Sequence, residues 1–121
     1  MVCRLRSVVF MTFMAFLISP AANAAELIML EQAGCYWCAK WNKEIGPIYP
    51  KTQEGKLASL RRVDIHAPVP PDLEFIRVER FTPTFVLVDD NQEIGRIRGY
   101  PGDEFFWFLV GELVAQLPQQ P

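Results

Sequence analysis

A short apolar run followed closely by two cysteines restricts the fold of this chain more than any other feature of its sequence. Residues 27–30 read Leu-Ile-Met-Leu, which predicts a buried central strand. Residues 35–46 predict a helix, because their apolar members recur at helical spacing: Cys38, Trp41 and Ile45. The cysteines Cys35 and Cys38 therefore lie where a buried strand gives way to a helix.

Strand and helix patterns continue along the chain beyond that helix. Three segments predict further strands (57–65, 84–88 and 93–98), and two predict further helices (72–79, with Asp72 as N-cap, and 103–117). The order is strand, helix, strand, helix, strand, strand, helix. A βαβ unit followed by a ββα unit predicts an α/β fold, a four-stranded mixed sheet with helices on both faces.

The first 24 residues have the form of a secretory signal and not of a folded domain. Two arginines precede an apolar run over residues 8–18, and residues 22–24 read Ala-Asn-Ala, a small-x-small cleavage site. The apolar run is shorter than the roughly 20 residues that a transmembrane helix needs. We therefore predict a signal peptide at 1–24 and one domain at 25–121. A retained anchor is the alternative; after cleavage we expect no stable membrane insertion.

Export determines which cysteines remain and the compartment in which they act. Of three cysteines, Cys3 leaves with the signal, so Cys35 and Cys38 remain. Twelve basic against fourteen acidic residues, without a basic cluster, argue against nucleic-acid binding. Three cysteines and one histidine exclude a zinc finger of the usual ligand count and a dense disulfide scaffold. The predicted location is the periplasm, an oxidising compartment in which a free dithiol needs an electron source.

The position of the cysteine pair favours dithiol redox chemistry. Unpaired backbone N–H groups at a helix N-terminus favour an anion, so a thiolate at Cys35 is stabilised there. Cys38 lies one helical turn further on, and its sulfur can reach that of Cys35. We expect Cys35 to attack a partner disulfide and Cys38 to resolve the mixed disulfide that results.

Two other interpretations of the pair remain open. A structural disulfide suits an exported protein, although a bond closing so short a loop constrains the unfolded chain little. A metal site is the second, but two thiolates and His66 fall one ligand short of a closed tetrahedral set, so we predict no metal. His66 itself is interpreted as a loop residue after the second predicted strand.

The motifs together resemble the thioredoxin superfamily over most of residues 26–117. Cys35-x-x-Cys38 follows an apolar strand, and Thr82-Pro83-Thr84 precedes another strand about 45 residues later, before a hairpin and a C-terminal helix. The amino-acid sequence around these motifs is similar to that of small periplasmic thioredoxin-like proteins, which are often encoded beside bacterial sulfur-oxidation genes. The similar segments are 31–38, 61–64, 81–88 and 95–102.

The resemblance implies a site and a direction of reaction. In this fold Pro83 is a cis-proline packed against the redox pair, and its bend leaves the backbone of Thr82 free to pair with an extended substrate. Tyr36 and Trp37, between the cysteines, help to set the potential and the contact surface. The resemblance further implies a reductant of periplasmic protein disulfides that needs no cofactor beyond the Cys35–Cys38 disulfide and is recharged by a membrane electron-donor protein.

The chain departs from cytosolic thioredoxin in two places. Tyr36-Trp37 stands where thioredoxin has Gly-Pro, and Met29 stands where it has a buried aspartate that helps to deprotonate the second cysteine. Glu31 is the nearest upstream acid and is a candidate for that proton transfer; the alternative is a solvated loop glutamate.

Three other functions remain as alternatives to a reductase. The first is an oxidant that donates disulfides, and the second is a regulatory or binding module that uses the pair for redox sensing. The third is a copper(I) metallochaperone, which the lack of a methionine cluster near Cys35 weakens.

Overall fold

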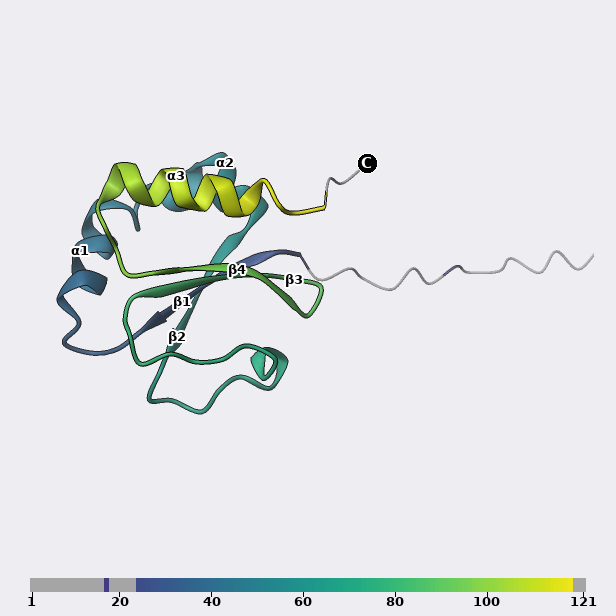
Figure 1. Ribbon diagram of the computed structural model, residues 1–121, viewed down its shortest axis with the longest axis horizontal. Helices are drawn as coiled ribbons and strands as arrows, with labels where there is room; N and C mark the ends of the chain where they lie inside the picture. Colours follow the sequence, from purple (N-terminus) through teal and green to yellow (C-terminus); the bar gives the residue numbers. More distant parts are fainter. Residues whose placement is uncertain (1–16, 18–23, 119–121) are drawn as a thin grey trace, which may run out of the picture.

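The computed structural model describes residues 17 and 24–118, which contain one four-stranded sheet (Figure 1). Its strands are β1 (Glu26–Glu31), β2 (Ser59–Asp64), β3 (Thr84–Asp89) and β4 (Gln92–Arg98), in the order β2-β1-β3-β4. β1 runs parallel to β2 and antiparallel to β3, and β4 pairs antiparallel with β3. This mixed sheet confirms the predicted fold class. The predicted signal peptide lies outside the described residues, apart from Leu17 and Ala24.

One face of the sheet carries the α-helices (Figure 1). They are α1 (Tyr36–Glu44), α2 (Gln53–Leu57) and α3 (Asp103–Val114), with a 3₁₀ turn, η1 (Tyr49–Lys51), between the first two. Apolar side chains of β1 and β3 that point to this face pack against the helices in one core, which includes Leu27, Met29, Trp41, Phe85 and Phe106. Trp41 is fully buried, as its helical spacing predicts. Among the described residues, none of the helices is long and apolar enough to cross a membrane.

The opposite face is covered by the connection between β2 and β3 and not by an α-helix, so the prediction of helices on both faces is wrong for this face. The predicted helix over 72–79 is wrong, because only a 3₁₀ turn, η2 (Pro71–Leu73), forms there. Asp72 does not cap a helix; the Arg61 guanidinium donates two hydrogen bonds to its carboxylate, at 2.6 and 3.0 Å. The buried residues of this connection that pack on the sheet are Leu73 and Ile76. Two such residues are too few to form the apolar face of a helix.

The sequence patterns also miss α2 and place its last residue, Leu57, in the second strand. Thr52 caps this helix by accepting a hydrogen bond from the Gly55 N–H at 3.1 Å. A Cβ on Gly55 would lie 1.9 Å from the carbonyl oxygen of Tyr49, so only glycine allows η1 and α2 to pack this closely. After Pro47 and Pro50 the chain therefore turns back along the sheet before it enters β2.

Candidate functional site

Cys35 occupies the first position of the turn that opens α1. Its backbone is extended (φ −76°, ψ 107°), so it is the N-cap of the helix, and its Sγ accepts a hydrogen bond from the Cys38 N–H at 3.1 Å. A side chain in this position accepts from N–H groups that have no partner within the helix. The predicted placement of this sulfur at a helix N-terminus is confirmed.

The second cysteine lies on the buried side of the same turn. Cys35 and Cys38 form a disulfide across Cα atoms 5.2 Å apart. Cys38 is only 3% exposed, whereas Cys35 is partly exposed. An incoming group can therefore reach the sulfur of Cys35 and not that of Cys38.

Thr82 and Pro83 approach the disulfide from the start of β3. The Thr82–Pro83 peptide bond is cis, as the resemblance implies, and Pro83 is buried. The Thr82 hydroxyl donates a hydrogen bond to Cys35 Sγ, over 3.3 Å. The structure thus brings together the two motifs that lie 47 residues apart in the sequence.

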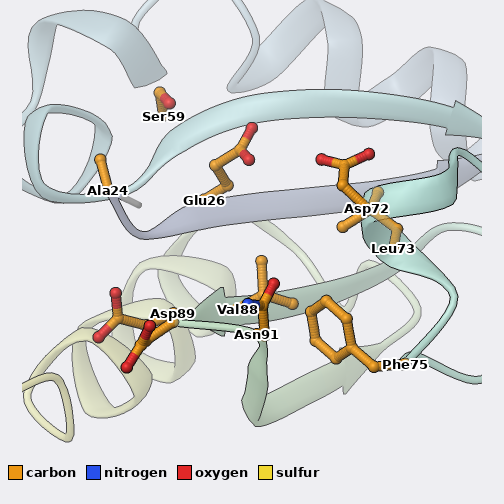
Figure 2. Close-up of a pocket in the computed structure, with 10 residues that line it drawn as sticks. Ala24, Glu26, Ser59, Asp72, Leu73, Phe75, Val88, Asp89 and Asn91 are labelled. Carbon is orange, nitrogen blue, oxygen red and sulfur yellow. The ribbon is translucent and has the colours of Figure 1, made fainter. Parts of the chain in front are cut away.

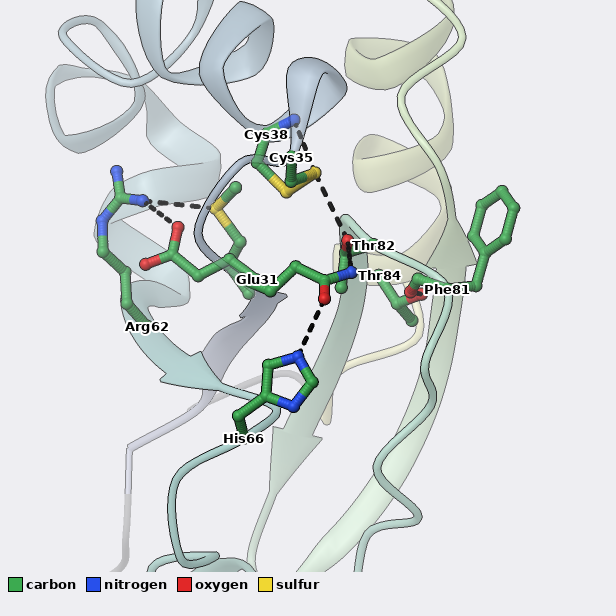
Figure 3. The surroundings of a disulfide bond; sticks show 10 residues. Glu31, Cys35, Cys38, Arg62, His66, Phe81, Thr82 and Thr84 are labelled. Atoms are coloured by element: carbon green, nitrogen blue, oxygen red, sulfur yellow. Dashed lines mark hydrogen bonds and ion pairs between the residues drawn. A yellow bond between two sulfur atoms is a disulfide. The ribbon is translucent and has the colours of Figure 1, made fainter.

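Two residues that the sequence analysis did not place at the site continue this contact (Figure 3). Gln32 Nε2 donates to Thr82 Oγ1 at 2.9 Å, and Gln32 Oε1 lies 2.9 Å from His66 Nε2. Gln32 follows β1, His66 follows β2 and Thr82 precedes β3, so all three lie at one end of the sheet. The position of Gln32 and His66 directly after predicted strands was the only available signal, and it does not reveal the order of the strands.

An exposed aromatic surface lies beside the disulfide. Tyr36 and Trp37 are 69% and 50% exposed, and their rings meet edge to face with centroids 5.1 Å apart. A shallow groove has seven lining residues: Trp37, Phe81, Thr82, Arg98, Gly99, Tyr100 and Pro101. Trp37 and Thr82 therefore share a surface, whereas Tyr36 lies outside the groove. Phe81, which is also exposed, was missed as a site residue.

Two side chains fix the walls of this groove. The Arg98 guanidinium lies 5.3 Å from the centre of the Phe81 ring, and its Nε donates to Glu79 at 2.8 Å. The Tyr100 hydroxyl donates to the Glu44 carboxylate of α1 at 2.5 Å. Burial raises the pKa of Tyr100, and the hydrogen bond and negative charge of Glu44 raise it further. Tyr100 therefore remains a neutral donor at physiological pH and ties the groove to α1.

Glu31 is the last residue of β1, and its carboxylate contacts an arginine. Arg62 Nη1 donates to Glu31 Oε2 at 2.7 Å and contacts Met29 Sδ at 3.5 Å. The arginine also lies 5.9 Å from the centre of the Trp41 ring. Arg62 thus contacts both Met29 and Glu31, and Glu31 lies at the same end of the sheet as the disulfide (Figure 3).

Another hollow lies at the opposite end of the sheet (Figure 2). Residues from the start of β1, the end of β3 and η2 line it, among them Glu26, Asp72, Val88 and Asp89. Arg61 pairs with both Glu26 and Asp72, at 3.6 and 2.6 Å. Within residues 24–118, no group of three or more His, Cys, Asp or Glu side chains could hold a metal ion.

Comparisons with known proteins were made by sequence and by structure. No family model and no curated protein matches the chain. Among solved structures, the periplasmic thioredoxin SoxS from Paracoccus pantotrophus, in its reduced form, is 48% identical with a TM-score of 0.72. That match covers 76% of this chain and 97% of SoxS. A thioredoxin from Malassezia sympodialis, Mala s 13, is 23% identical with a TM-score of 0.53, over 75% of this chain and 76% of its own, and shows the fold alone.

The identity to SoxS, its nearly complete coverage and the fold point to the same family. The chain also has the two motifs on which the resemblance to this family rests, the disulfide at the start of α1 and the Thr82–Pro83 segment beside it. The chain belongs to the thioredoxin superfamily, and its Cys35–Cys38 pair makes it a thiol-disulfide oxidoreductase.

Proposed function

We propose that this protein is exported to the periplasm, where it reduces disulfide bonds in partner proteins. The observation that carries the proposal is the unequal exposure of the two sulfurs. Cys35 caps α1 and is partly exposed, whereas Cys38 is 3% exposed. This asymmetry supports Cys35 as the nucleophile and Cys38 as the resolving cysteine.

The proposed reaction exchanges two thiols for one disulfide. The Cys35 thiolate attacks one sulfur of the partner disulfide, the partner S–S bond breaks, and its other sulfur leaves as a thiolate that takes up a proton. The Cys38 thiolate then attacks Cys35 Sγ, which forms the intramolecular disulfide and releases the second partner thiolate. The partner gains two electrons, and Cys35 and Cys38 lose them.

The groove beside the disulfide is the proposed contact surface for the partner. An extended partner segment would pair with the backbone of Thr82, a form of strand addition, while Trp37 and Phe81 contact its side chains. The exposed rings of Trp37 and Phe81 line this groove and can bury apolar partner surface.

The reducing direction and the electron source are further parts of this proposal. SoxS, which is 48% identical, is a periplasmic thioredoxin. Reduction in an oxidising compartment consumes electrons, so the Cys35–Cys38 disulfide has to be reduced again after each cycle. We propose a membrane protein with its own dithiol as that donor.

Export requires that removal of residues 1–24 leaves the fold intact. β1 begins at Glu26, so cleavage after Ala24 preserves the complete sheet. We expect the intact mass of the exported protein to correspond to residues 25–121. An exported protein that keeps its first 24 residues would instead support a membrane anchor.

Trapping tests the assignment of nucleophile and resolving cysteine. In a Cys38→Ala variant, the mixed disulfide on Cys35 cannot resolve, so we expect partner proteins to accumulate as adducts that dithiothreitol releases. Adducts are measured by non-reducing electrophoresis and mass spectrometry of periplasmic extracts. A Cys35→Ala, Cys38→Ala variant is the control and should capture none. Equal capture by Cys35→Ala alone would contradict the assignment.

The reduction potential tests the direction of the reaction. We expect equilibration with glutathione to give a value near about −270 mV, which is typical of a reducing thioredoxin. A value near about −120 mV is that of a strong oxidant and would replace the proposal with a disulfide donor.

Glu31 is the proposed proton acceptor for Cys38 during resolution. A Glu31→Gln variant should slow the resolution step at neutral pH and move its pH profile, because loss of a general base typically costs about 10²-fold or more. Glu26→Gln is a matched control, since Glu26 is the first residue of the same strand and also faces an arginine, at 3.6 Å. The two variants are compared by stopped-flow decay of a mixed disulfide on Cys35. Identical profiles for both variants and the unmodified protein would exclude this role.

A further inference from the structure

We propose that His66 and Gln32 are positioning residues that aim the hydroxyl proton of Thr82 at the sulfur of Cys35. This inference deepens the proposed function, since it concerns the same nucleophile. The four residues form one continuous path (Figure 3): His66 Nε2 to Gln32 Oε1 at 2.9 Å, Gln32 Nε2 to Thr82 Oγ1 at 2.9 Å, and Thr82 Oγ1 to Cys35 Sγ at 3.3 Å. We call this path the His66 relay.

The direction of the His66 relay depends on the Gln32 amide. An amide has a donor end and an acceptor end, whereas a hydroxyl has a single proton to donate. When the His66 ring donates from Nε2 to Gln32 Oε1, the amide nitrogen faces Thr82 and donates to its oxygen. The one proton of the Thr82 hydroxyl is then left for Cys35 Sγ.

The opposite arrangement removes the donor from the sulfur. If the amide turned over, its oxygen would face Thr82, and the hydroxyl would donate to Gln32. The Cys35 sulfur would then keep only the Cys38 N–H among the two donors that contact it here, at 3.1 Å. An imidazole that carries a proton on Nε2 excludes this arrangement, because two donors would then face each other.

Two steps of the His66 relay, Gln32 to Thr82 and Thr82 to Cys35, are partly shielded from water, whereas the His66–Gln32 step is exposed. Gln32 and Thr82 are both partly buried at the sheet end, and their mutual hydrogen bond is partly buried. His66 is exposed, but its turn is fixed because its backbone N–H donates to Asp64 Oδ1 at 2.9 Å. The backbone of His66 is thus held in place beside Gln32.

The charged groups near the imidazole come from several segments. Asp64 is the last residue of β2, two positions before His66, and Glu79 and Arg80 line a cavity together with His66 and Gln32. Glu31, the residue before Gln32, is paired with Arg62. Arg80 supplies a matched control, because it lines the same cavity and is not a member of the His66 relay.

The His66 relay matters for the nucleophile because a thiolate is stabilised by each hydrogen bond that it accepts. Loss of one hydrogen bond to a charged group corresponds to roughly a tenfold change in the thiolate fraction below the midpoint of its titration. His66 and Gln32 would therefore change the reactivity of Cys35 without touching it.

Alkylation of Cys35 tests the His66 relay directly. The rate of reaction with iodoacetamide is followed from pH 4 to 9 in the full chain carrying Cys38→Ala, with peptide mass spectrometry to separate Cys35 from Cys3. We expect His66→Ala to move the profile to higher pH and to slow the reaction at pH 6 by about three- to tenfold. Gln32→Met should do the same, and Arg80→Gln should stay within about twofold of the parent.

The Thr82→Val variant distinguishes an effect of His66 that passes through the Thr82 hydroxyl from a general effect of removing the imidazole. Valine removes the hydroxyl and keeps the shape, so adding His66→Ala to Thr82→Val should change the rate by less than about twofold. An equal effect of His66→Ala in both backgrounds would overturn the proposal, as would no effect of His66→Ala and Gln32→Met in the parent. Alkylation requires no partner, whereas trapping does, so the two experiments distinguish failure of the His66 relay from failure of the proposed function.

Discussion

Pairing of β1 with β2 on one side and with β3 on the other is the constraint on which the site depends. Because β1 and β2 are parallel, both finish at the same end of the sheet. β3 is antiparallel to β1 and therefore begins at that end. The backbone groups of the buried β1 must find partners, which ties all three strands together. This single pairing pattern places residues 66 and 82 within hydrogen-bond reach of residue 32.

Packing of α1 on that sheet decides which cysteine is exposed. Trp41 is fully buried, and its ring centre lies 5.2 Å from that of Phe85 and 5.6 Å from that of Phe106. Cys38 lies three residues before Trp41 and therefore shares its buried face. Cys35, at the N-cap, stands outside the helix and remains accessible. The difference in exposure between the two sulfurs thus follows from the packing of α1 around this tryptophan.

Local sequence patterns correctly predicted those elements whose conformation depends on their own side chains and not on contacts with distant segments. The β-hairpin turn at 89–92 forms as expected, with Asp90 and Asn91 at φ of 48° and 58°, a conformation that these residue types tolerate. The expected helix over 72–79 fails, because Asp72 pairs with Arg61 from the neighbouring strand instead of capping a helix. A capping signal in the sequence does not reveal such a competing partner.

The sequence by itself determined the strand, the helix that follows it and the two cysteines one turn apart, because apolar spacing and helix capping act over a few residues. Only the tertiary structure decided which polar groups reach the reactive sulfur. Gln32 meets Thr82 and His66 across sequence separations of 50 and 34 residues. The order and register of the strands bring them together, and these depend on how the whole sheet buries its two faces.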